Sequence, residues 1–276
     1  MKSCVTLSLV PSLANGPWIY RGDLNKSIAK AKSAGFQAIE LFAASADAVD
    51  ATALSRWLTE SDIRLAAVGT GAGKVLHGLS LTSPDVTVRR EAVRYITDMI
   101  AFGAEFGAHT IVGSMQGRFE PAQDEQRVLS WLVEGLRELS TEAAQRGVCL
   151  ILEPLNRYET NLINTLGQGI GLIRDNRLTH VGLLADLFHM NIEEVSLSGA
   201  LLEAKDYIEH IHFADSNRRP MGMGHTRIND ISLVLRDIHY HGYLSAEALP
   251  YPDPDQAAAQ TMKAFTQLSS THSELA

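Results

Sequence analysis

The stretch GVCLILEPLNRYET, residues 147–160, runs from a glycine through a buried strand into a dense polar segment. Gly147 is typical of a helix end, because glycine adopts the left-handed conformation without steric cost. The apolar run predicts a strand over residues 148–153 that ends on a carboxylate, Glu153. An unpaired buried carboxylate is costly, so we expect a partner for this charge at the end of the strand.

The same alternation recurs along the whole chain. Apolar segments predict strands over residues 4–10, 36–42, 63–69, 109–113, 148–153, 181–186, 208–215 and 243–249. Helical patterns cover residues 24–34, a segment through Leu54 and Trp57, and about 85–106, 124–145 and 255–268. Short, largely apolar strands that alternate with helices are typical of parallel sheets buried on both faces. We therefore expect an α/β fold, a (β/α)8 TIM barrel, as a single domain over residues 1–276.

A doubly wound open sheet is the alternative architecture. Its dinucleotide-binding form is disfavoured, because no G-x-G-x-x-G motif follows the first predicted strand. No segment resembles a linker, a repeat or a low-complexity tract.

The composition excludes several function classes. The chain is 45% hydrophobic and 20% charged, as expected for a globular protein with a sizeable core. Its formal net charge of -8 argues against nucleic acid or an anionic membrane as a partner, since both attract basic surfaces. No apolar stretch is long enough to span a bilayer. The two cysteines, Cys4 and Cys149, predict buried free thiols and a cytoplasmic location.

The ends of four consecutive strands carry the main prediction of a site. In a barrel, the active site lies at the carboxyl ends of the strands. Residues able to bind a metal stand there on strands five to eight, namely Glu153, Asp186, His212 and Glu247. Three converging carboxylates would repel one another unless a cation joined them. Oxygen-rich ligation with one nitrogen suits Mn²⁺ or Mg²⁺, with Co²⁺ as a further choice, better than zinc.

Each of these residues also has a structural interpretation. A single carboxylate at a strand end is commonly a helix cap or a surface charge, and a histidine in a strand is commonly a core residue. His210 competes with His212, because residues two apart in a strand point to the same face. We prefer His212, which lies closer to the carboxyl end. The clustering on consecutive strands favours the metal site.

Polar segments follow the same strands and predict a polyhydroxylated ligand. They contain Asn156, Arg157 and Glu159 after the fifth strand, His189 after the sixth, and Asp215, Asn217, Arg218 and His225 after the seventh. Arg218 and Arg219 are equally consistent with a solvated pair of loop residues.

Several motifs resemble the xylose-isomerase-like barrel superfamily of sugar isomerases and epimerases, and most of all its D-tagatose/D-psicose 3-epimerase group. They are EPLNRYETNLINT, ADLFHMNIEE, HIHFADSNRRPMGMGH and GYLSAEALP, with a weaker likeness at Glu40 and Gly69 in the first half. The chain departs from that group at Leu187, where threonine is frequent, at Arg227, where aspartate is frequent, and in the segment LPYPDP.

The resemblance implies a role for each motif residue. Glu153, Asp186, His212 and Glu247 match the metal ligands, and Glu153 and Glu247 also match an acid/base pair. Glu159, His189 and Arg218 match positions that contact substrate hydroxyls. The resemblance further implies a homo-oligomer, either a dimer or a tetramer.

Together these features predict a metal-dependent sugar isomerase or epimerase acting on a sugar or sugar phosphate. We expect ketose 3-epimerisation, in which two glutamates transfer protons on opposite faces of C3 through a metal-stabilised enediolate. A one-face proton shuttle between C1 and C2 would give aldose–ketose isomerisation with the same residues. An abasic-site endonuclease-like phosphoesterase and a non-catalytic sugar-binding barrel are less favoured alternatives, the first because of the acidic charge.

Overall fold

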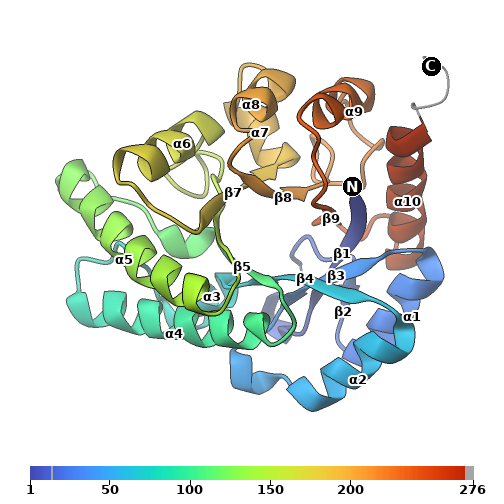
Figure 1. The fold of residues 1–276 in the computed structure, drawn as a ribbon, viewed down its shortest axis with the longest axis horizontal. Helices are drawn as coiled ribbons and strands as arrows, with labels where there is room; N and C mark the ends of the chain where they lie inside the picture. Colours follow the sequence, from blue (N-terminus) through green and yellow to red (C-terminus); the bar gives the residue numbers. More distant parts are fainter. Residues whose placement is uncertain (14, 271–276) are drawn as a thin grey trace.

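The computed structural model describes residues 1–13 and 15–270, and these form a closed parallel barrel surrounded by helices. The sheet order is β2-β1-β3-β4-β5-β6-β7-β8-β9, and an additional β1–β9 pairing closes the ring. All of the strand pairs are parallel. Figure 1 shows the helices as an outer layer around the strands. The predicted (β/α)8 barrel is confirmed.

The barrel strands are shorter than the sequence predicts at several ends. They are β1 (Lys2–Ser8), β3 (Ala38–Phe42), β4 (Arg64–Gly69), β5 (His109–Val112), β6 (Leu150–Leu152), β7 (Val181–Asp186), β8 (Ile208–His212) and β9 (Tyr243–Ala246). The short β2 (Tyr20–Arg21) pairs with β1 and was not predicted. Glu153 and Glu247 therefore lie just beyond their strands, where the backbone is leaving the sheet.

The long helices lie where the sequence patterns place them. The α-helices are α1 (Leu24–Ala34), α2 (Ala51–Ser61), α3 (Gly71–His77), α4 (Val86–Ala104), α5 (Glu125–Gln145), α6 (Leu166–Asp175), α7 (Leu187–Glu193), α8 (Leu197–Glu203), α9 (Ile228–Asp237) and α10 (Pro254–Ser270). Short 3₁₀ turns occupy Pro11–Leu13, Ala46–Ala48 and Ser114–Gln116. The helix predicted over residues 24–34 ends there, because Gly35 caps α1 in the left-handed conformation with φ 96°.

Aspartates begin five of the helices, since a side-chain oxygen can accept a free backbone N–H of the first turn. Asp23, Asp50, Asp85 and Asp124 cap α1, α2, α4 and α5 in this way. Asp186 does the same for α7, so this predicted ligand also begins a helix. Its Oδ1 accepts the N–H groups of Phe188 and His189, which leaves Oδ2 free to contact His212 on β8.

Apolar side chains fill the layer between strands and helices in two large clusters. Inside the barrel the residues are smaller. One layer contains Ala67, Ile111, Ile151 and Leu184, and another contains Cys4, Ala38 and Ala66. This close packing inside the barrel restricts movement of the polar side chains at the carboxyl ends of the strands.

Candidate active site

The structure brings the four predicted ligands together at the carboxyl ends of β6 to β9. Glu153, Asp186, His212 and Glu247 each offer a ligand atom, and these four atoms lie within 4.8 Å of one another. Asp186 and His212 are 1% and 0% exposed, whereas Glu153 and Glu247 are each 7% exposed. The two glutamates therefore keep contact with the cavity above, while the other two residues form its base.

Strand register explains this convergence. Asp186 and His212 are direct partners in the β7–β8 pair, and paired residues on parallel strands point to the same face of the sheet. Glu153 follows Leu152 at the end of β6, where its N–H still donates to Val112 at 3.0 Å. Glu247 follows Ala246 at the end of β9.

His212 lies at the centre of the cluster. Its Nδ1 is 3.1 Å from Asp186 Oδ2, 3.2 Å from Glu247 Oε2 and 3.3 Å from Glu153 Oε1. Burial alone would lower the pKa of this imidazolium. The charge of Glu40 and hydrogen bonds to surrounding carboxylates outweigh burial and raise the pKa of His212 well above its ordinary value.

Arg218 adds a fixed positive charge to the same cluster. Its guanidinium pairs with Asp186 and with Glu247, and it lies over the Phe188 ring, 4.9 Å from the ring centroid. Burial would raise the pKa of Asp186, but the Arg218 charge, with nearby histidines, holds it well below its usual range. Only 12% of the Arg218 side chain is exposed, so the solvated-pair interpretation is wrong for this residue.

The loop that carries Arg218 is ordered by a buried aspartate. Asp215 accepts backbone N–H groups from Ser216, Gly222, Gly224 and Thr226. Arg218 itself adopts φ 62°, a conformation that non-glycine residues seldom take. The sequence marked Asp215 as a polar loop residue, but its role is to shape the loop.

The other two predicted substrate residues lie beside the cluster. His189 Nδ1 is 2.7 Å from Asn156 Nδ2 and 3.9 Å from Glu159 Oε1. His189 Nε2 faces the candidate ligands, at 3.8 Å from Asp186 Oδ2 and 4.0 Å from Glu153 Oε1. Arg157, in contrast, turns outward and pairs with Glu193.

A cavity of about 310 Å³ opens over these residues. Its polar side contains Glu153, Glu159, His189, Arg218 and Glu247, and its apolar side includes Leu13, Trp18, Phe42, Val75 and Leu249. Sequence reasoning missed the apolar side. These residues come from loops, a 3₁₀ turn, the end of β3 and helix α3, far apart along the chain, and no local pattern distinguishes them from core residues.

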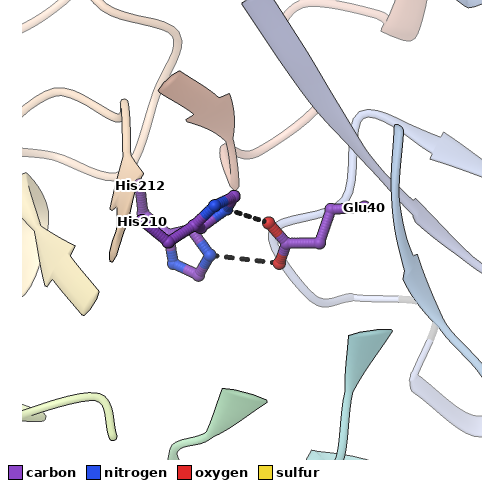
Figure 2. A group of neighbouring side chains, drawn as sticks. All are labelled: Glu40, His210 and His212. Atoms are coloured by element: carbon purple, nitrogen blue, oxygen red, sulfur yellow. Dashed lines mark hydrogen bonds and ion pairs between the residues drawn. The ribbon is translucent and has the colours of Figure 1, made fainter. Parts of the chain in front are cut away.

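Sequence reasoning also left Glu40 without a role. Its carboxylate accepts from both histidines of β8, with Oε2 2.8 Å from His210 Nε2 and Oε1 3.1 Å from His212 Nε2, as Figure 2 shows. His210 thus faces Glu40 and does not join the four-residue cluster. The preference for His212 as the residue nearer the other three agrees with this placement.

The donor set fits a divalent cation. Three carboxylates and one imidazole nitrogen are the oxygen-rich ligand type that suits Mn²⁺ or Mg²⁺. Glu153 Oε1 is buried, and no hydrogen bond of good geometry reaches it from the described residues; its polar neighbours are His212 Nδ1 at 3.3 Å and His189 Nε2 at 4.0 Å. A buried carboxylate oxygen without a well-formed hydrogen bond is unfavourable, so this atom is suited to bind a cation.

Comparison with known proteins is consistent with the fold and motifs. A model of the xylose isomerase-like TIM barrel family matches residues 28–268. The chain belongs to this family. It is 32% identical over 196 residues to a D-psicose 3-epimerase of Ruminiclostridium cellulolyticum, covering 68% of this chain and 67% of the relative. It is also 40% identical over 125 residues to a 3-dehydro-D-guloside 4-epimerase of Escherichia coli, covering 45% and 48%.

A solved D-psicose 3-epimerase has the same fold. The D-psicose 3-epimerase of Clostridium cellulolyticum H10, crystallised with D-tagatose, superposes with a TM-score of 0.79 at 24% identity and covers 98% of both chains. The named relatives are epimerases, so the predicted enzyme class, an isomerase, is confirmed.

Two further predictions concern the two cysteines and membrane-spanning segments. Cys4 is buried and Cys149 is partly buried, and both thiols are free. Burial raises the pKa of Cys149 to about 12, which makes its thiol unreactive near neutral pH. Among the described residues, no helix combines the length and the apolar character that a bilayer crossing requires.

Proposed function

We propose that this chain is a divalent-metal-dependent ketose 3-epimerase in which Glu153 and Glu247 exchange protons with C3 of the substrate. One observation carries the proposal. Two glutamates from different strands line one cavity, and their ligand atoms lie within 4.8 Å of each other and of His212. The epimerase names of the relatives support the same reaction class.

The two glutamates approach the substrate position from the ends of β6 and β9. In the deprotonated state, one of them removes the C3 proton from one face of the sugar. The other starts protonated and delivers its proton to the opposite face, which inverts the centre and leaves the two glutamates with exchanged protonation states. His189, Glu159 and Arg218 line the same cavity and are placed to orient the hydroxyl groups of the sugar.

Glu153, Asp186, His212 and Glu247 would hold the metal ion. A divalent cation bound by these residues would stabilise negative charge that develops on substrate oxygens. The proposed ion is Mn²⁺, with Mg²⁺ or Co²⁺ as substitutes.

The charges of the cavity favour an unphosphorylated sugar. Among the described residues that line it, Arg218 is the only lysine or arginine. Its guanidinium pairs with two carboxylates, which leaves little positive charge to bind a phosphate. We therefore place free ketoses ahead of ketose phosphates as substrates. The homo-oligomeric state and the cytoplasmic location stay predictions.

Two neighbouring reactions compete with 3-epimerisation. A proton shuttle on one face between C1 and C2 would isomerise an aldose and a ketose. Inversion at C4 of a 3-keto sugar is favoured by the 40% identity to the Escherichia coli 4-epimerase, although that match spans about half of each chain.

The decisive experiment locates the exchanged hydrogen. Free D-psicose, D-tagatose, D-fructose and L-ribulose are incubated with the Mn²⁺-loaded protein in D₂O, and NMR identifies the deuterated carbon. We expect deuterium at C3 together with the C3 epimer, and no turnover after treatment with a chelator. Deuterium confined to C1 or C2 would replace epimerisation by isomerisation. Ketose binding without exchange or turnover would identify a sugar-binding barrel.

A further inference from the structure

Two buried polar residues outside the proposed reaction lie on the far side of His212 from the carboxylate cluster. Glu40 comes from β3 and His210 from β8, and both are 0% exposed. β3 and β8 are not neighbours in the sheet. The Glu40 side chain therefore reaches across the barrel interior to the two histidines, as the view in Figure 2 shows.

Glu40 uses both of its oxygens in this contact. Oε2 lies 2.8 Å from His210 Nε2, and Oε1 lies 3.1 Å from His212 Nε2. Each oxygen thus has one imidazole nitrogen at hydrogen-bond distance inside the buried barrel. Hydrogen bonds to a carboxylate are shorter and stronger than hydrogen bonds to a neutral acceptor.

The contact determines which edge of the His212 ring faces the candidate ligands. Nε2 is held by Glu40, so Nδ1 lies on the opposite edge, within 3.1 to 3.3 Å of three carboxylates. A neutral imidazole with its proton on Nε2 presents a free lone pair at Nδ1, and metal-binding histidines are commonly held in this way. Any rotation of the ring would break the bond to Glu40.

We propose that Glu40 is a positioning residue that fixes the ring and the tautomer of His212 for metal binding, and that His210 braces Glu40. The inference rests on the proposed metal site. His210 acts only on Glu40 in this arrangement, because its Nε2 contacts Glu40 and its Nδ1 has no hydrogen-bond partner among the described residues.

A second metal ion held by Glu40, His210 and His212 is the competing interpretation, since their ligand atoms also lie close together. The structure favours hydrogen bonding. Both Glu40 oxygens already have an imidazole partner at hydrogen-bond distance, and none of the three residues is exposed to solvent. An ion would have no open coordination position there and no route for exchange.

The test replaces Glu40 by Gln and compares it with Glu209→Gln as the matched control. Glu209 lies next to His210 on β8 but on the exposed outer face. Calorimetric titration with Mn²⁺ gives the affinity and the number of ions per chain. We expect Glu40→Gln to weaken Mn²⁺ binding about 10- to 100-fold, with one ion per wild-type chain. Glu209→Gln should bind like the wild type.

A second measurement separates positioning from general damage to the fold. Long-range ¹H–¹⁵N spectra of the Mg²⁺-loaded protein report which imidazole nitrogen carries the proton. We expect the proton on Nε2 of His212 in the wild type and an altered His212 signal in Glu40→Gln. If Glu40→Gln does not fold, His210→Gln replaces it. That variant should bind Mn²⁺ about 3- to 10-fold more weakly, since Glu40 keeps one partner.

The outcomes distinguish this inference from the proposed function. Unchanged Mn²⁺ affinity and an unchanged His212 signal in the variants would overturn the role of Glu40 while leaving the metal site intact. Two ions per wild-type chain, with one lost in Glu40→Gln, would make Glu40 a ligand. A wild-type chain that binds no Mn²⁺ and exchanges no substrate hydrogen would overturn the metal site and the positioning role together.

Discussion

The two halves of the barrel have the same architecture and different strand ends. In the first half, β3, β4 and β5 end at Phe42, Gly69 and Val112, and these ends supply apolar surface and space. In the second half, β6 to β9 end at or next to Glu153, Asp186, His212 and Glu247. The charged residues of the cavity therefore come from the second half, whereas the first half contributes uncharged surface, and neither half forms the cavity alone.

Two histidines, one from each half, also differ in pKa. His212, in the second half, is buried among carboxylates and its pKa is raised. His109, in the first half, is partly buried and has no carboxylate partner among the described residues; its burial, together with the charge of His210, lowers its pKa to about 4. The same side chain thus acquires opposite electrostatic behaviour from its immediate neighbours.

The largest expected effect separates the two proposed acid/base residues. Glu153→Gln and Glu247→Gln should each lower epimerase activity by about 10²- to 10⁴-fold, the usual contribution of a positioned acid or base. Each variant keeps one carboxylate, so we expect slow deuterium exchange from one C3 epimer only, opposite in the two variants. The measurement is NMR in D₂O on both epimers. Equal exchange from both epimers would place the two protons on one residue.

The next effect tests whether the first half supplies space. A Cβ on Gly113, just after β5, would overlap Glu153 Oε2. Gly113→Ala should displace that carboxylate and lower kcat/KM by about 10- to 100-fold, since small displacements at a reacting group are costly. The control is Gly171→Ala in α6, where the added methyl meets nothing within 4 Å. Full activity in Gly113→Ala would show that Glu153 tolerates the shift.

A smaller effect concerns the stability of the metal-free protein in acid. His109 Nδ1 accepts the N–H of Cys149 at 3.1 Å, which requires a neutral ring. Because the folded pKa of about 4 lies below the unfolded value, the unfolded chain binds the extra proton first as the pH falls.

Stability should therefore be complete above about pH 7.5 and fall by about 3 kcal/mol as the pH approaches 4. Denaturant titrations at several pH values measure this slope, and His109→Gln should flatten it. An unchanged slope in the variant would assign the acid sensitivity to other groups.

The smallest expected effect is a gain in folding stability. Gly171 lies inside α6 with open space around it, and a helical glycine costs about 0.5 to 1 kcal/mol relative to alanine. Gly171→Ala should raise stability by that amount without changing the activity. Thermal unfolding and kcat/KM on one preparation measure both, and a loss of activity would connect α6 to the site.

The sequence predicted a strand and the charge at its end wherever both lie in one short segment. Apolar runs ending in Glu153 or Asp186 are local patterns, so the strands and the charges at their ends could be predicted from neighbouring residues. The barrel geometry then predicted which ends meet, because consecutive strands are adjacent in a closed sheet.

Contacts across the barrel could not be predicted in this way. Glu40 meets His212 over 172 positions of sequence, and the pairing depends on the side-chain layers inside the closed sheet. Trp18 and Phe42 form part of the cavity through a ring contact that no local pattern marks. The short helices α3, α7 and α8 also lacked a periodic signal, since seven residues span fewer than two turns.

Closure of the ring sets the order in which the protein is completed. β1 pairs with β9, and the Thr6 hydroxyl donates to the Ala246 carbonyl at 2.9 Å, next to Glu247, across 240 positions of sequence. During synthesis this bond can form only after nearly the whole chain has been made, because β9 is the last strand. Glu247, the second proposed acid/base residue, follows β9, so an incomplete chain lacks the proposed catalytic pair.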